Sequence, residues 1–406
     1  MRQVPDGADR LVVVLSDIEM GAGGPLDDFP HSAWLADLIR SYLEPPYQGL
    51  EIDLVFDGDT FDFLKTSVDG QYPRHVTRAV ALAKLHRVLA VHPAFIEGVR
   101  EFLDASPHHN VHFVIGNHDA ELAFPVVQAE LAEAIGRGRV HFPGFAVDFG
   151  DLHVEHGQQH DPMFAVNPEQ PLIEWKGHTM LDLPWGSIAL LDVIMPMHEI
   201  FYALDRVKPR GAVFQLLPEV REVVSNAFWR YFTREYVVEA WRGDDPTRKA
   251  SWGMLRDVLY RFTTFDAGTS ADTPVYQKLT QDLPDARVVV VGHLHNAAWW
   301  TAADRKLLQT GCLRDEYVID PMGTVVGSLP KVYAECFLQG PRTIRSELVE
   351  VWGPPPVPGH VPASILELRD AARPLLAPQA ERDRMRAEEE AHVAREEGTD
   401  DGQQER

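Results

Sequence analysis

Short apolar runs recur along this chain, and seven residues of the types that bind metal ions stand directly after them. The runs read LVVVLSDIEMG, IDLVFDGDTFD, VHFVIGNHDAE, LHVEHGQQHD and ARVVVVGHLHN, and the seven residues are Asp17, Glu19, Asp59, Asn117, His156, His293 and His295. Carboxylate, amide and imidazole ligands without thiolates suit divalent ions such as Mn, Fe, Zn and Co. Seven ligands are too many for one ion. With a bridging carboxylate they fit two ions about 3.5–4 Å apart, an arrangement that activates a water for in-line attack on phosphorus.

The apolar runs predict the elements that position these ligands. Continuous runs rich in Val, Ile and Leu are typical of strands covered on both faces. Residues 31–43 and 121–135, which lie between the runs, have helical patterns, and strands that alternate with helices predict a layered α/β architecture. Every polar cluster follows the carboxyl end of its predicted strand, where open α/β sheets bind their ligands.

His293 and His295 are two residues apart. On an extended strand both side chains would point the same way, so a turn-like backbone at the strand end is needed to present one to each ion. Taken alone, such a pair is more often an ordinary surface pair. Its position after VVVVG, at a strand end like the other clusters, favours metal binding.

The spacing of these clusters divides the chain into three parts. We assign residues 1–161 and 286–353 to the core that carries the clusters. Residues 162–285 are predicted to be a helical insertion or cap, because this interval is longer than a loop needs to be. Residues 354–406 begin with a Pro-rich linker and continue as a charged tail with few apolar residues, for which we expect a solvated helix or disorder.

Composition excludes some classes of partner. The 406 residues carry a formal net charge of −23, which disfavours nonspecific electrostatic binding to nucleic acid or to an anionic membrane. The apolar run LVVVL near the start is too short for a signal sequence or a membrane span. Cys312 and Cys336 form no CxxC pair, which fits a reducing compartment. We therefore expect a soluble cytoplasmic protein without a leader.

The ordered motifs resemble those of the calcineurin-like metallophosphoesterases. They are DxE at Asp17, GDxxD from Gly58, GNHD from Gly116, HG at His156 and GHxH from Gly292. The order is complete over residues 11 to about 296, with the insertion as an interruption. One such motif would be weak, but five in order at predicted strand ends are specific.

This resemblance implies a fold, a cofactor and roles for the ligands. The implied fold is a four-layer αββα sandwich with a dinuclear metal site at one edge. Asp17 and His295 would hold the first ion, Asp59 would bridge, and the second ion would be held by Asn117, His156 and His293. We expect manganese, with iron, zinc and cobalt as alternatives.

The resemblance also implies a catalytic role for His118. This histidine would contact the phosphoryl oxygen or protonate the leaving group, steered by Asp119, a role that needs a positioned imidazole that titrates near the working pH. A structural turn residue is the alternative. Asn117 and His118 would both contact the substrate.

Glu19 departs from the usual DxH motif. A carboxylate can still bind the first ion, although loss of that ion is the alternative. A third ligand carboxylate makes the site less electrophilic and favours Mn. On this argument we expect cleavage of a diester or pyrophosphate to exceed cleavage of a monoester.

Other residues are weaker candidates. Arg314 follows the fifth predicted strand and either holds a phosphate oxygen or pairs at the surface with a neighbouring carboxylate. Asp62 either orients a ligand or caps a helix. We expect four further histidines to be ordinary surface or hydrogen-bonded residues: His31, His160, His178 and His198.

These observations predict a metal-dependent phosphoesterase that cleaves a diester, pyrophosphate or monoester by attack of a metal-bound hydroxide. Its substrate would be a small phosphorylated compound, lipid-linked or nucleotide-linked. GNHDAEL, EHGQQHDP and TGCLRDEY resemble a bacterial group related to the UDP-2,3-diacylglucosamine pyrophosphatases, whose helical cap holds acyl chains; ordinary packing of the insertion is the alternative. The rival functions are a nuclease of the same superfamily and a catalytically silent scaffold that binds a partner through the cap. The oligomeric state is left open.

Overall fold

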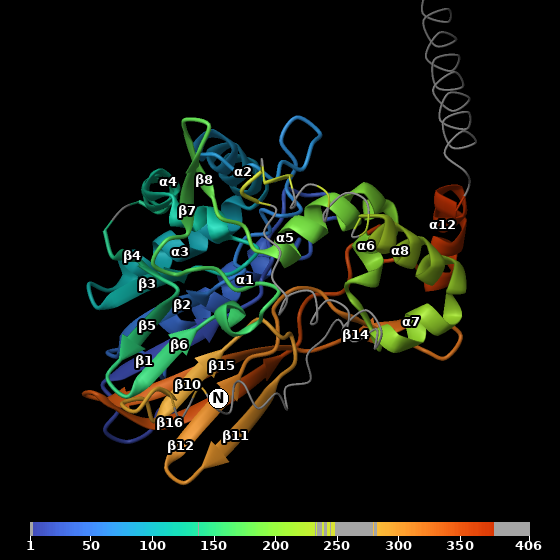
Figure 1. Cartoon of the computed structure of the whole chain (residues 1–406). Helices are drawn as coiled ribbons and strands as arrows, with labels where there is room; N and C mark the ends of the chain where they lie inside the picture. The colour runs from blue at the N-terminus through green and yellow to red at the C-terminus, as the bar shows by residue number, and fades with distance from the viewer. Residues whose placement is uncertain are drawn as a thin grey trace, which may run out of the picture.

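In the computed structural model the chain forms an α/β fold built around two facing β-sheets (Figure 1). The structure describes residues 3–136, 138–231 and 282–376, together with positions 233, 238, 242, 243, 245–247 and 279. The α/β class predicted from the alternation of strands and helices is confirmed.

The first sheet has six strands in the order β16-β15-β1-β2-β3-β4. Strands β1 to β4 are parallel neighbours, whereas β15 runs antiparallel to β1 and β16 antiparallel to β15. Their bounds are Arg10–Leu15 (β1), Glu51–Asp57 (β2), His109–Val114 (β3), Val140–Gly144 (β4), Lys331–Gln339 (β15) and Arg342–Val351 (β16). The carboxyl ends of β1, β2 and β3 therefore lie side by side.

The second sheet has five strands in the order β11-β12-β10-β6-β5. Strand β10 is parallel to both β6 and β12, and the two edge strands are antiparallel to their neighbours. The bounds are Ala146–Phe149 (β5), Leu152–Glu155 (β6), Val288–Val291 (β10), Ala298–Ala302 (β11) and Arg305–Gln309 (β12). The two strands that precede His156 and His293 are thus direct neighbours.

The two sheets pack face to face through small aliphatic side chains. Val12 and Val14 of β1 belong to the same buried cluster as Val154 of β6 and Val290 of β10. These residues alternate with side chains that point to the opposite face of each strand, as the pleat requires. This contact places the carboxyl ends of β1 to β3 next to those of β6 and β10.

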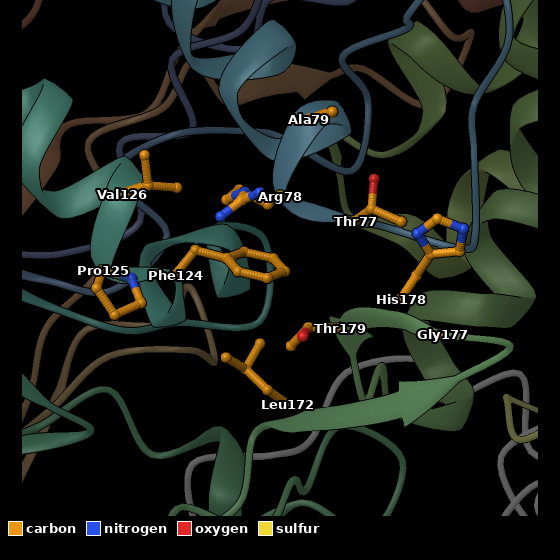
Figure 2. A pocket seen from close by; sticks show the side chains of 10 residues that line it. All are labelled: Thr77, Arg78, Ala79, Phe124, Pro125, Val126, Leu172, Gly177, His178 and Thr179. Atoms are coloured by element: carbon orange, nitrogen blue, oxygen red, sulfur yellow. The ribbon is translucent and has the colours of Figure 1, made fainter.

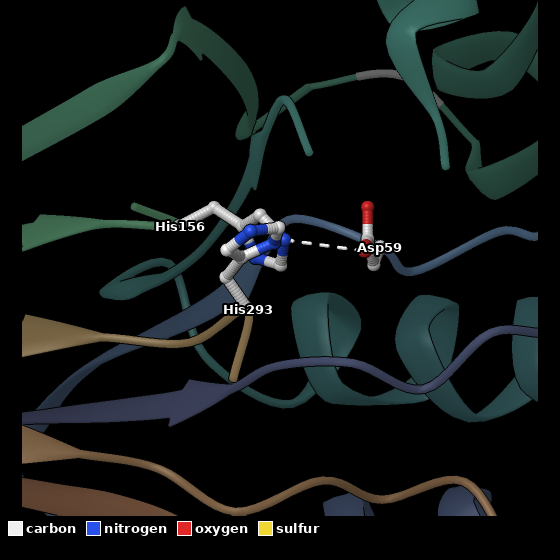
Figure 3. Close-up of side chains that lie close together, drawn as sticks. All are labelled: Asp59, His156 and His293. Carbon is white, nitrogen blue, oxygen red and sulfur yellow. Dashed lines mark ion pairs between the residues drawn. The ribbon is translucent and has the colours of Figure 1, made fainter. Parts of the chain in front are cut away.

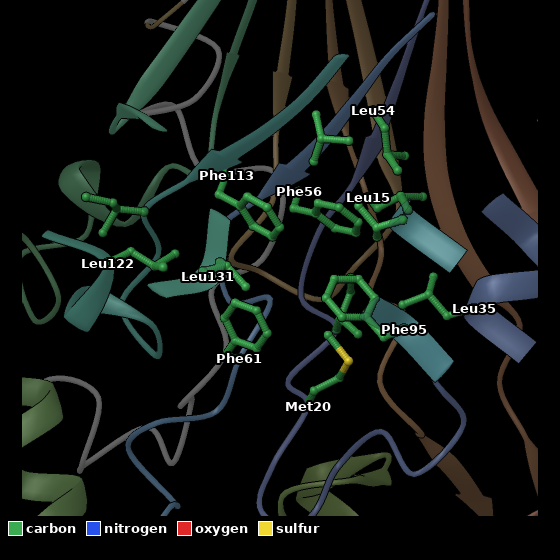
Figure 4. Packing of buried hydrophobic residues seen from close by; sticks show 14 of the residues in the cluster. Leu15, Met20, Leu35, Leu54, Phe56, Phe61, Phe95, Phe113, Leu122 and Leu131 are labelled. Carbon is green, nitrogen blue, oxygen red and sulfur yellow. The ribbon is translucent and has the colours of Figure 1, made fainter. Parts of the chain in front are cut away.

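Helices cover the other face of the first sheet. Their bounds are Ser32–Arg40 (α1), Ser41–Leu43 (η1), Arg78–Val91 (α2), Pro93–Ala105 (α3), Ala120–Ala123 (η2) and Pro125–Ile135 (α4). Figure 4 shows the aromatic centre of this layer, where the rings of Phe56 and Phe113 stack 4.9 Å apart and Phe95 of α3 meets Phe56 edge-on. Burial of these large side chains is the main stabilising contribution of the layer.

From residue 158 to 230 the chain leaves the core through one short turn, Gln158–His160 (η3), and then forms the described part of the insertion, which begins with a hairpin and is largely helical. Its elements are Leu172–Trp175 (β7), His178–Leu181 (β8), Trp185–Ala189 (α5), the π-helical turn Leu190–Ile194 (η4), Met195–Met197 (η5), His198–Leu204 (α6), Val207–Lys208 (β9), Arg210–Leu216 (α7) and Pro218–Arg230 (α8). Strand β9 pairs with Tyr317–Ile319 (β13), which also pairs with Val325–Ser328 (β14). The apolar pattern at 187–207 is therefore helical as predicted, and most of residues 232–285 lie outside the described residues.

The C-terminal segment contains more structure than the predicted linker and tail. Ile365–Glu367 (η7) and Leu368–Leu376 (α12) follow the Pro-rich stretch, and α12 lies beside α8 at the right of Figure 1. Ile365, Leu368 and Ala372 are buried in one cluster with Val220 of α8. Sequence analysis missed this helix because residues 365–376, whose apolar residues stand at helical spacing, were grouped with the Pro-rich linker and the charged tail. Residues 377–406 lie outside the described residues.

The apolar stretch Trp185–Leu204 has the length of a membrane span. In the described residues it is the one continuous helical stretch of this kind, with a mean hydropathy of 1.4, and half of its apolar window is buried. Ile200, Ala203 and Leu204 belong to the core of the insertion. This packing accounts for the apolar character of the buried half.

A fully buried ion pair fixes the segment that follows β3 to helix α2. Nζ of Lys84 lies 2.8 Å from Oε1 of Glu121, and both side chains are 0% exposed. Removing one partner of such a pair leaves an uncompensated charge in the protein interior. The pair thus holds η2, which directly follows the GNHD turn, at a defined place on the helical layer.

We predict that Lys84→Met lowers the free energy of unfolding by about 3–5 kcal/mol, and that Lys84→Met combined with Glu121→Leu recovers most of this loss. Urea unfolding of both variants measures the difference. Glu130→Gln is the matched control, because Glu130 of α4 pairs with His86 of α2 at the surface, with 48% and 58% of the side chains exposed; this change should cost less than about 1 kcal/mol. Equal losses for Lys84→Met and the control would contradict the prediction.

Candidate metal centre

The segments after β1 and β2 stay paired beyond the ends of the strands. The backbone N–H of Asp17 donates to the carbonyl of Gly58, and that of Glu19 donates to the carbonyl of Asp59, at 3.3 and 2.8 Å. Met20 continues the series by donating to Thr60 at 3.0 Å. These hydrogen bonds hold two predicted ligand segments in a fixed register.

Five of the seven predicted ligands have left-handed backbone conformations. Their φ angles are 52° for Asp17, 54° for Glu19, 49° for Asp59, 69° for His293 and 55° for His295. This conformation costs an L-residue about 1–2 kcal/mol and is found at functional sites where surrounding contacts impose it. The turn-like backbone predicted for the histidine pair is therefore present.

Three ligands from three different strand ends converge. Figure 3 shows Asp59 after β2, His156 after β6 and His293 after β10, whose candidate ligand atoms all lie within 4.8 Å of one another. Nε2 of His156 is 3.2 Å from Oδ2 of Asp59, while its Nδ1–H donates to the carbonyl of Asp57 at 2.8 Å. A hydrogen bond of this kind fixes the tautomer and leaves Nε2 available to a metal ion.

Asn117 is the residue predicted to join this ligand set. Its Oδ1 atom is buried and has no hydrogen-bond partner in the structure, which is costly for a polar atom unless a ligand satisfies it. The preceding Gly116 permits the close approach, because a Cβ there would lie 2.2 Å from Oδ1 of Asp59. The residues present therefore fit a divalent cation between Asp59, Asn117, His156 and His293.

A second group of ligands lies next to the first. Oδ1 of Asp17 is 3.0 Å from Nε2 of His295 and 4.0 Å from Nε2 of His156. The other carboxylate oxygen of Asp17 accepts hydrogen bonds from Ser16 Oγ and from the backbone N–H of His293. Oδ1 is thus left facing the histidines, and Asp17 and His295 fit the predicted first ion.

The electrostatics of the site call for a cation. Burial on its own would lower the pKa of His156, but the carboxylates of Asp59 and Asp17 raise it well above its ordinary value. Burial lowers the pKa of His293, so this imidazole is neutral and can donate its lone pair. A divalent ion would supply the positive charge that the carboxylates otherwise draw from a proton.

Glu19 is placed differently from the other ligands. Both of its carboxylate oxygens lie 3.0 Å from Nη1 of Arg314, and Oε2 lies 3.3 Å from Nζ of Lys65. Oε1 is also 3.4 Å from Nε2 of His295, which leaves Glu19 within reach of the first ion. The two cations beside it, Lys65 and Arg314, are shared with other carboxylates, so the expected loss of electrophilicity and the diester preference derived from it stay predictions.

Arg314 lies inside the molecule and not at the surface. It is 2% exposed, and its Nη1 also contacts Asp205 of the insertion at 2.9 Å. Nη2 lies 3.3 Å from Oε1 of Glu316. The alternative of a salt bridge with a neighbouring carboxylate is therefore present as the pair with Glu316, but it is buried and not at the surface, and the guanidinium is shared among several carboxylates beside the metal centre.

His118 stands beside the ligands with a carboxylate on its ring. Its Nδ1–H donates to Oδ1 of Asp62 at 3.0 Å, and its backbone N–H donates to Oδ1 of Asp59 at 2.7 Å. Burial alone would lower the pKa of His118, but the carboxylates of Asp62 and Asp59 raise it to about 10. The imidazole is therefore protonated at neutral pH.

The carboxylate that steers His118 is Asp62 and not Asp119. Oδ1 of Asp119 accepts from the backbone N–H of Gly116 at 2.7 Å, and Oδ2 accepts from that of Thr60 at 2.8 Å. Asp119 thus joins the turns after β2 and β3 and acts on His118 only through the backbone. Asp62 starts no helix; it also accepts from the backbone N–H of Lys65 at 3.0 Å.

The four histidines expected to be ordinary residues have partners or lie elsewhere. His31 pairs with Asp315 at 2.9 Å and His160 with Glu155 at 2.6 Å. His178 lines a cavity of about 550 Å³ beside the amino ends of α2 and α4, shown in Figure 2. No predicted ligand lines that cavity.

A smaller cavity of about 280 Å³ opens directly onto the metal centre. Its polar end is formed by Lys65, His118, Asp205, His295 and Arg314, and its apolar end by insertion residues that include Leu190, Ile194, Phe201, Val213 and Phe214. His198 also lines it, while its Nδ1–H donates to the carbonyl of Met195 at 2.9 Å. The insertion therefore supplies one wall of a cavity whose other wall carries predicted catalytic residues.

Sequence analysis missed Lys65 and the residues that meet it. Lys65 contacts Glu19, Asp28, Asp62 and Asp205, and it follows Asp62 by three residues in GDTFDFLK, a spacing that could have indicated it. Asp205 had no local signal, because it comes from the insertion and meets the core only in the folded chain.

Comparisons with known proteins leave the family open. No protein-family model matches the chain, and no curated protein matches it. Among solved structures, a protein of Staphylococcus aureus assigned as a 5′-nucleotidase is similar over 90% of this chain, with 11% identity and a TM-score of 0.32; this chain spans only 58% of its length. The phosphopantetheinyl hydrolase of Mycobacterium tuberculosis is similar over 76% of this chain and 91% of its own, with 13% identity and a TM-score of 0.26. Likenesses this distant carry no argument about function, which must come from the site itself.

Proposed function

We propose that this protein is a metal-dependent hydrolase of phosphate esters. The observation that carries the proposal is the convergence of Asp59, His156 and His293 with the unpartnered Oδ1 of Asn117, beside the His118 ring that Asp62 holds. Hard and borderline divalent ions prefer this donor set. A catalytically silent scaffold would gain nothing from strained turns that face carboxylates and imidazoles toward one point.

The chain's own residues provide the rest of the chemistry. Two divalent ions, one at each group of ligands and with manganese expected, would polarise the phosphoryl group. They would also lower the pKa of a water, so that it can lose a proton and attack the phosphorus as hydroxide. The resemblance to the calcineurin-like enzymes implies that Asp59 would contact both ions. The second-ion ligands come from rigid strand ends, which is the placement that keeps a reactive geometry in register.

His118 is suited to protonate the leaving oxygen. Its side chain lines the cavity that opens onto the centre, and Asp62 holds Nδ1, so Nε2 is the atom that can deliver a proton. Positioned acids of this kind contribute roughly 10²- to 10⁴-fold to turnover. The leaving group would accordingly lie in the cavity beneath the insertion.

The finer family assignments also remain proposals. The ordered motifs support the calcineurin-like superfamily and its four-layer sandwich. Two sheets and one helical layer are visible in the described residues. The relation to UDP-2,3-diacylglucosamine pyrophosphatases rests on the three short resemblances alone. We propose a small phosphorylated substrate, with the insertion as the cap over it.

We predict that the purified protein binds two divalent ions per chain and loses both on Asp59→Asn, because the bridging role proposed for that carboxylate makes it a ligand of each ion. His293→Asn should release about one ion, since it belongs to the second group only. Elemental analysis after dialysis against a weak chelator measures the content. The control is His178→Asn, in the other cavity, which should keep both ions. Full loading of the Asp59→Asn protein would contradict the assignment.

We predict that His118→Asn lowers turnover of alkyl phosphates by roughly 10²- to 10⁴-fold while the metal content is unchanged. The loss should be much smaller for 4-nitrophenyl esters, whose leaving groups need no proton. Steady-state kinetics at matched metal loading gives both ratios.

The matched control for His118 is His141→Asn, a histidine of β4 outside the site, which should leave both rates unchanged. Asp62→Asn should shift the alkyl-to-nitrophenyl ratio in the same direction as His118→Asn, but less. An equal loss on alkyl and nitrophenyl esters for His118→Asn would exclude the proton-donor role.

A further inference from the structure

The cavity beside His118 has one charged end and one apolar end. The charged end contains Lys65, Arg314 and Asp205, and the apolar end is formed by side chains such as Ile194, Phe201 and Phe214 of the insertion. A leaving group protonated by His118 enters this cavity. The properties of the cavity therefore select what is attached to the scissile phosphate.

The cations at the charged end are already saturated by carboxylates. Nζ of Lys65 and Nη1 of Arg314 lie 3.3 and 2.9 Å from the same oxygen of Asp205. Among the described residues, the network joins four lysine and arginine side chains, Lys65, Arg206, Lys208 and Arg314, to five carboxylates, Glu19, Asp28, Asp62, Asp205 and Glu316. The His118 ring adds a hydrogen bond to Asp62. Lys65 and Arg314 are thus already paired with carboxylates, and a second anionic group would have to compete with these for them.

Asp205 is the member of this network that faces the substrate. Its side chain is 35% exposed, whereas those of Glu19, Asp28 and Asp62 are at most 1% exposed. It follows the end of α6, so it reaches the core from the insertion. A negatively charged leaving group in the cavity would meet this carboxylate and would have to displace it from two ion pairs.

We propose that the cavity takes an uncharged, apolar leaving group and that Asp205 is the residue that excludes a second negative charge. This inference rests on the proposed phosphate ester hydrolase function. Like-charge contact is a common device for rejecting a wrong ligand, and the apolar wall favours a hydrocarbon chain or ring. A pyrophosphate whose second phosphoryl group points into the cavity is rejected on the same ground.

The test compares two ligands that differ only at the far end. Hexylphosphonate and 6-phosphonohexanoate carry the same phosphonate and nearly the same chain, but the second ends in a carboxylate, and neither is hydrolysed. Calorimetry with the manganese-loaded protein should show hexylphosphonate binding at least tenfold more tightly. Asp205→Asn should reduce this ratio several-fold, mainly by improving the binding of the carboxylated ligand. The corresponding phosphate monoesters should show the same change in the ratio of kcat/KM.

Asp192→Asn is the matched control. Asp192 belongs to the same helical stretch of the insertion but pairs with Arg74 at 3.3 Å and does not line the cavity, so the ratio should stay as in the wild type. Equal or tighter binding of 6-phosphonohexanoate to the wild type, or an unchanged ratio in Asp205→Asn, would overturn the inference. The proposed function would still stand if the protein hydrolysed simple phosphate esters. If no phosphonate bound and no ester was cleaved, both would fall.

Discussion

The backbone pairing that continues beyond β1 and β2 is the constraint on which the site depends. Successive hydrogen bonds from Asp17, Glu19 and Met20 to the segment 58–60 hold both turns in left-handed conformations that an isolated chain would avoid. Asp119 extends the same connection to the turn after β3 by accepting from Thr60 and Gly116. The face-to-face contact of the two sheets then brings His156 and His293 to these turns, and the stability of the core sustains the local strain.

Charge is organised in two zones around this point. One zone contains Asp17, Asp59 and Asn117, and in it Oδ1 of Asp17 and Oδ1 of Asn117 are buried without a hydrogen-bond partner, so that it fits divalent cations. The other zone contains Lys65 and Arg314, whose positive charges are already paired with carboxylates. His118 stands between them, with Asp62 on one side of its ring and the cavity on the other. A phosphate would thus be bound at the metal centre, where bound cations supply positive charge. A neutral leaving group would be bound separately, in the cavity.

Sequence reasoning predicted the site residues that follow strand ends, but few of the contacts that the insertion makes with the site. The apolar runs identified β1, β2, β3, β6 and β10, and the polar residue after each run lies at the centre, because parallel strands bring their carboxyl ends together. Arg314 was identified as a candidate, but its buried ion pairs were not predicted, and Lys65 and Asp205 were missed. The partners of these residues lie far away in sequence. Asp119 was given the role of Asp62, because adjacency in a motif does not show which carboxylate meets a ring. Helix α12 was missed although its apolar residues stand at helical spacing, because it lies between a Pro-rich stretch and a charged tail and was grouped with them.

Anomalous diffraction from crystals loaded with manganese and a phosphate-like oxyanion such as tungstate tests the central claim most directly. The account predicts two manganese peaks about 3.5–4 Å apart, one among Asp59, Asn117, His156 and His293 and one beside Asp17 and His295. The oxyanion should lie over both, with one oxygen toward His118. Manganese bound elsewhere, or an oxyanion seated on Lys65 and Arg314 in place of Asp205, would contradict the account.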